Sequence, residues 1–111
     1  MPTITDSYMK EMLAKSREYS FVILKPGPNL NMPNGNQIIW EHARRNFELR
    51  AEGKLAIVAP MLDGGEIQGI YIFAVTVEET KAIMDGDPAV KAGIFVYEIH
   101  PCRSFPGDKL P

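Results

Sequence analysis

Four short runs of apolar residues divide the chain. The runs are FVIL at 21–24, LAIVA at 55–59, GIYIFAV at 69–75 and IFVYEI at 94–99. Their β-branched and aromatic residues are typical of β-strands. The first three are almost continuously apolar, whereas a strand with one face in water alternates apolar and polar residues. The pattern therefore predicts a sheet that is covered on both faces.

Two helices precede the second run. Asp6 or Ser7 can cap a short helix that runs to about residue 17. The segment 37–52 has the clearest helical pattern, and Gly53 after it provides a left-handed C-cap.

The other segments contain breaks. Residues 25–36 (KPGPNLNMPNGN) are rich in Pro, Gly and Asn and form a long loop, of the kind that is often functional in compact domains. A third helix follows Thr76 and stops at residues 85–86. Asp87 can cap a further short turn with Pro88 in its first position, where proline is favoured.

The resulting order is β-α-β-β-α-β with an extra N-terminal helix. It predicts an α+β, ferredoxin-like fold, in which two helices lie on one face of a four-stranded antiparallel sheet. The other apolar face then needs a cover. The economical cover is the same face of a second copy, which makes a homodimer. The alternative is that the N-terminal helix folds over this face within one chain.

Three regions follow from this order. They are an N-terminal helical extension at 1–18, the ferredoxin-fold domain at 19–101 and an irregular C-terminal tail at 102–111. The whole chain has 111 residues, 45% of them hydrophobic and 23% charged, as in one ordinary globular domain.

Composition and charge exclude several classes of function. A formal net charge of -2 with scattered basic residues gives no reason to expect a nucleic-acid partner. No run approaches the ~18 apolar residues of a membrane span, and the charged N-terminus lacks the core of a signal peptide. Cys102 has no partner for an internal disulfide. We therefore expect a cytoplasmic protein without a membrane partner.

No cofactor is indicated either. Two histidines and one cysteine do not form a metal site of recognisable spacing. The chain has no phosphate-binding loop and no dinucleotide fingerprint.

His42 is the first candidate for chemistry. A helical wheel places it on the margin of the apolar stripe of the helix at 37–52, at 100° per residue. That stripe consists of Ile39, Ala43 and Phe47, widened by Trp40 and Leu49. A marginal histidine is usually a packed, hydrogen-bonded residue, but an imidazole can also serve as an acid or base near neutral pH.

Asp87 is the second candidate, in the segment DGDPAVKAG at 85–93. Helix capping alone would explain an aspartate before a proline. A carboxylate, however, has several acceptor sites, so one oxygen can cap the helix while the other orients an imidazole. An aspartate that binds one ring nitrogen fixes the tautomer and leaves the other nitrogen as a base.

These two motifs resemble the YciI-like (YCII-related) family of small α+β proteins over about residues 21–101. The first match is His42 followed, after ten residues, by Gly53-Lys54-Leu55. Ala59-Pro60 comes next, where the family usually has Gly-Pro. The second is Asp87-Pro88 with a glycine five residues beyond the proline.

The resemblance implies a sheet-to-sheet dimer of the dimeric α+β barrel type, with the matching histidine in the active site. Family members with assigned activity, such as a chlorohydroxyhydroquinone dehydrochlorinase, use a His–Asp pair, and the position of Asp85 also lines that site. Here Asp85 is a second acid, which can raise the basicity of the histidine or hold a cationic group.

The hypothesis is a cofactor-free lyase or isomerase that acts on a small organic substrate. His42 would be the base, Asp87 its orienting partner and Asp85 a further site residue. The alternative is a non-catalytic module, either a small-ligand binder or a stress-related accessory protein. Weaker candidates, for which a packing or surface role is the simpler interpretation, are Tyr71, Tyr97, Arg44, Arg45 and His100.

Overall fold

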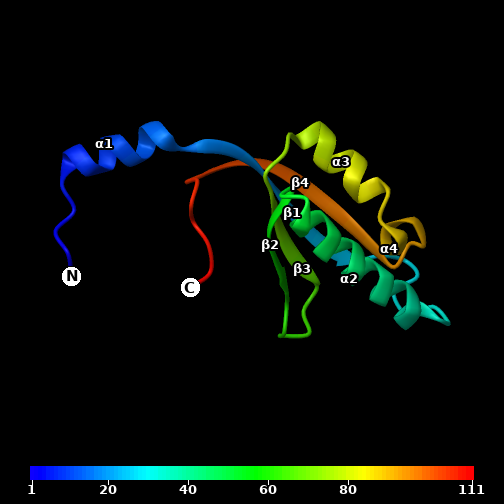
Figure 1. The fold of residues 1–111 in the computed structure, drawn as a ribbon. Coiled ribbons are helices and arrows are strands. Elements are labelled where there is room, and N and C mark those ends of the chain that lie inside the picture. The colour runs from blue at the N-terminus through cyan, green and yellow to red at the C-terminus, as the bar shows by residue number, and fades with distance from the viewer.

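The computed structural model describes residues 1–111 and contains four helices and four strands (Figure 1). In chain order these are α1 (Asp6–Lys15), β1 (Arg17–Pro26), α2 (Gly35–Ala51), β2 (Leu55–Pro60), β3 (Gly69–Phe73), α3 (Val77–Asp85), α4 (Pro88–Lys91) and β4 (Phe95–Ser104). The strands form one sheet in the order β2-β3-β1-β4, and every neighbouring pair is antiparallel. The predicted α+β class is therefore confirmed. No helix has both the length and the apolar character needed to cross a membrane.

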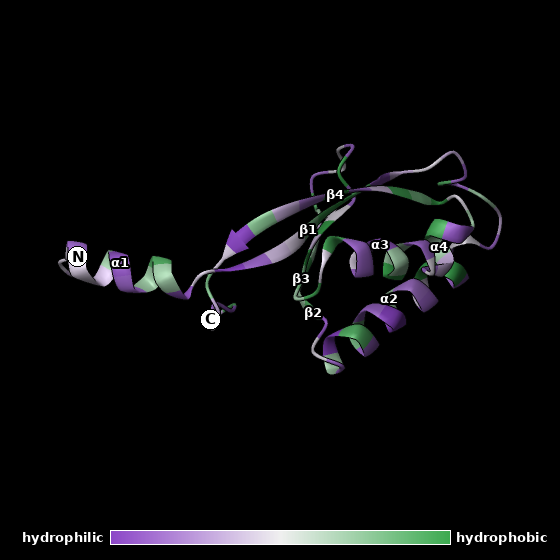
Figure 2. Ribbon diagram, turned by 90° about the horizontal axis from the view of Figure 1, so that it is seen from above, coloured by the Kyte–Doolittle hydropathy of each residue, from purple (hydrophilic) through white to green (hydrophobic).

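The helices α2, α3 and α4 lie together on one face of the sheet (Figure 2). Along β1 the buried residues Ser20, Val22 and Leu24 alternate with half-buried Phe21 and Ile23. This alternation follows from the pleat, which points successive side chains to opposite faces. The core under the helices contains Val22, Leu24, Leu49, Leu55, Tyr71, Phe73, Ile83, Met84, Ala89, Ile94 and Phe95.

The opposite face of the sheet is also apolar but has no cover within the chain. Phe21, Ile23, Ile70 and Ile72 are half-buried there. The helix α1 does not fold over this face, because it stands away from the body of the molecule (Figure 1) and has no buried residue. The alternative of a cover supplied by the chain's own N-terminal helix is therefore wrong for this structure.

β1 and β4 pair over ten residues each, from Arg17 opposite Ser104 to Pro26 opposite Phe95. β3 joins β1 only from Ser20 onward, so the outer ends of β1 and β4 form a two-stranded ribbon that leads to α1. The prediction of an irregular chain from residue 102 was wrong, because β4 continues to Ser104. Pro101 does not stop it, since β4 is an edge strand, where a missing N–H is tolerated.

Capping residues in the sequence predicted most helix ends correctly. Gly53 has the expected positive φ of 78°, and Thr76 caps α3 by accepting a hydrogen bond from the Glu79 N–H at 3.1 Å. The cap of α1 was predicted wrongly. It is Thr5, whose hydroxyl accepts from the Tyr8 N–H at 3.1 Å, and not Asp6 or Ser7.

The buried side of α2 differs most from the prediction. Trp40 and Phe47 were expected in the core stripe, but they are 64% and 60% exposed. The buried residues of α2 are Gly35, His42, Asn46 and Leu49. The helix thus turns two polar side chains inward, which is tolerable only if each finds a hydrogen-bond partner there.

Candidate functional site

Asp87 lies at the break between α3 and α4 and is only 2% exposed. Its Oδ2 accepts hydrogen bonds from the N–H groups of Ala89 at 3.0 Å and Val90 at 3.1 Å. Asp87 is thus the N-cap of α4, with Pro88 at the start of that helix, as the sequence predicts. This capping role fixes the position of the carboxylate.

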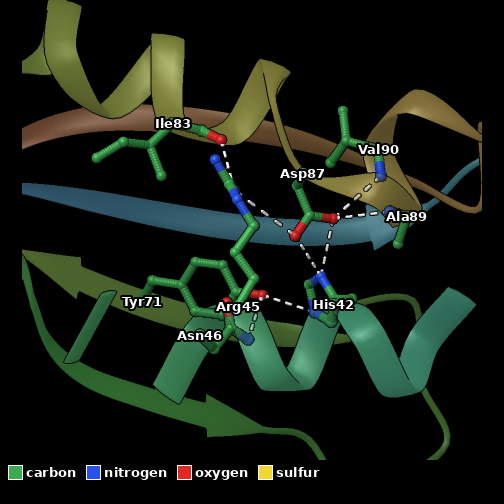
Figure 3. A network of polar contacts seen from close by, with 8 residues as sticks. All are labelled: His42, Arg45, Asn46, Tyr71, Ile83, Asp87, Ala89 and Val90. Atoms are coloured by element: carbon green, nitrogen blue, oxygen red, sulfur yellow. Dashed lines mark hydrogen bonds and ion pairs between the residues drawn. The ribbon is translucent and has the colours of Figure 1, made fainter. Parts of the chain in front are cut away.

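The imidazole of His42 reaches the same carboxylate from α2 (Figure 3). Its Nδ1 lies 2.8 Å from both Oδ1 and Oδ2 of Asp87. The ring also packs against Phe95, with 5.3 Å between the ring centroids. The structure therefore brings together the two residues that the sequence motifs single out.

The other ring nitrogen has a partner as well. The Nε2 of His42 lies 3.0 Å from the hydroxyl of Tyr71, which comes from β3. The amide Nδ2 of Asn46 donates to that hydroxyl at 3.4 Å. Asn46, Tyr71, His42 and Asp87 thus form one continuous chain of hydrogen bonds, which we call the His42 network (Figure 3).

The His42 network has a direction. Asp87 accepts from two backbone N–H groups, so the hydrogen between it and His42 is assigned to Nδ1. Nε2 is then an acceptor, and Tyr71 donates to it. Burial, first of all, and then the negative charge of Asp87 raise the pKa of Tyr71 well above its usual range, which keeps the phenol protonated for this role.

Arg45 supports the carboxylate from the side. Its Nη1 donates to the carbonyl oxygen of Ile83 at 2.7 Å and lies 3.9 Å from Oδ1 of Asp87. Gly86 makes room for the guanidinium, because a Cβ there would stand 3.0 Å from Nη2 of Arg45. The positive charge and the backbone donors together compensate the burial of the Asp87 charge.

The His42 network lies largely inside the protein. His42 is 7% exposed, and Tyr71 is 2% exposed. No buried side-chain polar atom lacks a hydrogen-bond partner. His42 is thus slightly more exposed than Tyr71 and Asp87, its two hydrogen-bond partners.

This arrangement has the parts of a general base. A carboxylate on Nδ1 fixes the ring and stabilises the imidazolium that forms when Nε2 takes a proton. In this structure Nε2 is occupied by Tyr71, so a substrate proton reaches it only when the Tyr71 hydroxyl moves off or passes the proton on.

Asp85 has hydrogen-bond partners other than His42. Its oxygens bind Nζ of Lys81 at 2.6 Å and the hydroxyl of Tyr97, on the exposed side of α3. The hydrogen bond from Lys81, above all, lowers the pKa of Asp85. The structure therefore brings the carboxylate of Asp87 to His42 and gives the carboxylate of Asp85 other partners.

Some of the weaker candidates lie beside His42 and Asp87, and others lie on the surface. Arg45 and Tyr71 take part in the site, whereas Arg44 pairs with Glu41 at 3.2 Å on the exposed side of α2. His100 is an exposed neighbour of Glu98, at 3.3 Å.

Asn46 was not predicted. The available signal was its place four residues after His42 on the same helix, since residues four apart share one face.

Comparisons with known proteins point to one family. Residues 12–103 match the sequence model of the YCII-related domain. No curated protein matches the chain. A similar solved structure is 5-chloro-2-hydroxyhydroquinone dehydrochlorinase (TftG) from Burkholderia phenoliruptrix AC1100, in complex with 2,5-dihydroxybenzoquinone. It is 20% identical, with a TM-score of 0.47, and the match covers 73% of this chain and 90% of that one.

Proposed function

Because this chain belongs to the YCII-related domain family, we propose that it is a cofactor-free acid-base enzyme that acts on a small organic molecule. His42 is the base, and Asp87 orients it and stabilises its charged form. The observation that carries the proposal is the 2.8 Å contact between Nδ1 of His42 and the buried carboxylate of Asp87. Such a pair is sufficient for proton abstraction near neutral pH.

The proposed reaction is an elimination or an isomerisation. Nε2 of His42 takes a proton from the substrate. In an elimination the electron pair left behind expels a leaving group, and in an isomerisation it shifts a double bond while the imidazolium returns the proton to another substrate atom. Tyr71 must turn its hydroxyl away from Nε2 when the substrate binds. Asn46 still donates to the phenol oxygen, so only the hydroxyl hydrogen needs a new acceptor, and in this proposal the bound substrate supplies it.

Asp85 has a smaller part in this proposal than its sequence position suggests. It could hold a cationic group of the substrate at the end of α3. Its ion pair with Lys81 at 2.6 Å argues against that part, because the carboxylate already has a cation.

The assembly is part of the proposal. The strand order β2-β3-β1-β4 supports a ferredoxin-like assignment with α1 as an addition. The uncovered apolar face with Phe21, Ile23, Ile70 and Ile72 supports a homodimer of the dimeric α+β barrel type, in which two sheets pack face to face. A cytoplasmic location, with neither nucleic acid nor membrane as partner, rests on composition and charge alone.

One observation favours a second candidate function. Both ring nitrogens of His42 already have protein partners, and no buried side-chain polar atom of the chain is unsatisfied. A network complete in itself can also be purely structural. The protein would then be a non-catalytic small-ligand-binding or accessory module.

Turnover and binding separate the two candidates. Wild type, His42→Gln and the control variant Tyr97→Phe would be screened against hydroxylated aromatic compounds and hydroxy acids, with product formation and NMR shift changes as readouts. The enzyme proposal expects turnover in wild type and Tyr97→Phe that is lost in His42→Gln. Binding without turnover in all three proteins would favour the module.

A further inference from the structure

The apolar side of α1 is largely open to solvent. Tyr8, Met9 and Leu13 are 48%, 49% and 47% exposed, and no residue of α1 is buried. A ten-residue helix without packing partners is marginal in water. The stability of α1 therefore calls for a surface on which this stripe packs.

A second apolar surface without a partner lies on the outer side of α2. Trp40 and Phe47 are 64% and 60% exposed there. They share a shallow groove whose lining is Trp40, Ala43, Arg44, Phe47, Glu48 and Ala51. Two large exposed aromatic side chains on one helix face are typical of an interaction site.

The two surfaces are too far apart to meet within one chain. The molecule measures 56 × 29 × 22 Å, and α1 occupies one end of it while α2 lies in the body at the other (Figure 1). The only connection is the two-stranded ribbon formed by the outer ends of β1 and β4. A second copy of the chain can supply each surface with its partner.

We propose that the α1 stripe of one copy docks on the Trp40–Phe47 groove of a second copy, and that the contact is reciprocal. Full burial of an aromatic side chain covers about 150–250 Å². At the observed exposures, covering both surfaces removes roughly 600 Å² per contact, so two contacts reach about the 1,200 Å² of the smallest stable interfaces.

The charges along the two surfaces are compatible with this contact. Lys15 and Glu11 edge the α1 stripe and pair with each other at 3.1 Å. Arg44 and Glu48 edge the groove on α2. One acid and one base on each side allow opposite charges to meet along the seam, and no unpaired run of one sign opposes docking.

Trp40 is the only tryptophan in the chain, so its fluorescence reports this surface alone. In the full-length protein at micromolar concentration we expect emission at a shorter wavelength, which moves to longer wavelength on dilution. The stripe variant, with Met9→Ser and Leu13→Ser, should emit at long wavelength at every concentration. The matched control, with Lys10→Ser and Ala14→Ser on the other side of α1, should behave as wild type.

A mixing experiment tests whether the contact forms between copies. The stripe variant supplies Trp40 but no docking helix, and a Trp40→Phe chain supplies an intact α1 but no tryptophan. Their mixture should shift Trp40 emission to shorter wavelength, and a Trp40→Phe chain that also carries the stripe substitutions should not.

Two results would overturn the proposal. One is equal emission from wild type and the stripe variant, which means that α1 does not cover Trp40. The other is a wild-type shift that survives dilution and is absent on mixing, which means that α1 folds back on its own chain. The sheet-to-sheet dimer is judged separately, by the sedimentation mass of the stripe variant, so either contact can fail alone.

Discussion

Replacing Asp87 with asparagine should reverse the direction of the whole His42 network. Asparagine caps a helix about as well as aspartate, so α4 keeps its start. However, Nδ1 of His42 faces both carboxylate oxygens at 2.8 Å, and one of these positions becomes an N–H₂ donor. The donor–donor contact is relieved when His42 moves its hydrogen to Nε2. Nε2 then donates to Tyr71, whose own hydrogen loses its acceptor.

The size of the effect follows from these contacts. A hydrogen bond to a charged group contributes about 1.5–3 kcal/mol, and a buried donor left unsatisfied costs about 1–3 kcal/mol. Tyr71 is 2% exposed, so solvent does not replace the lost acceptor. In a Tyr71→Phe background there is no hydroxyl to be left unsatisfied, so this second cost disappears. Asp87→Asn should therefore destabilise wild type by about 1–3 kcal/mol more than it destabilises Tyr71→Phe.

The assay is a double-mutant cycle of urea unfolding. The four chains (wild type, Asp87→Asn, Tyr71→Phe and the double variant) are compared at one protein concentration, because an oligomer gains apparent stability by mass action. A coupling energy near zero, or one of the opposite sign, would refute the direction assigned to the hydrogen bonds. It would leave Asp87 as a helix cap without a link to Tyr71.

Other predictions concern packing and pH. Gly27→Ala should destabilise the protein by about 1–3 kcal/mol or more in urea unfolding, because its Cβ would stand 2.2 Å from the carbonyl oxygen of Gly93. Leu49→Ala, at a buried position of α2, should cost about 2–5 kcal/mol, whereas Phe47→Ala should stay within about 0.5 kcal/mol in a dilute monomer. Equal costs would contradict the observed orientation of α2. Burial raises the pKa of Tyr71 in the folded protein above its ordinary 10.0. The protonated phenol therefore contributes its full stabilisation below pH 10, and this contribution decreases as the pH rises above 10, where the unfolded chain releases the proton. Unfolding at a series of pH values should show a smaller alkaline loss in Tyr71→Phe than in wild type.

Local patterns were sufficient for much of the fold. The apolar runs predicted the positions of all four strands. Gly53, Thr76 and Asp87 predicted helix ends that the structure confirms. These features depend on neighbours within a few residues. For the same reason the Asp-Pro pair predicted the cap of α4 without any knowledge of what else the carboxylate binds.

The orientation of α2 could not be predicted in this way. A helical wheel ranks faces by hydrophobicity, and by that measure Trp40 and Phe47 belong inside. His42 and Asn46 take their place because Asp87 and Tyr71, far away in sequence, satisfy them. Such pairings are tertiary contacts, which the hydrophobic periodicity of one helix does not predict. The same holds for β4 beyond Pro101, which continues because β1 extends beside it.

The tautomer of His42 in the wild-type protein tests the central claim most directly. A base that acts through Nε2 must leave that nitrogen without a hydrogen, while Nδ1 donates to Asp87. Nitrogen-15 NMR of the imidazole at neutral pH distinguishes the two ring nitrogens by their shifts and by their couplings to ring protons. The account predicts a hydrogen on Nδ1 and none on Nε2. A hydrogen on Nε2, in the other tautomer or in the imidazolium, would contradict it.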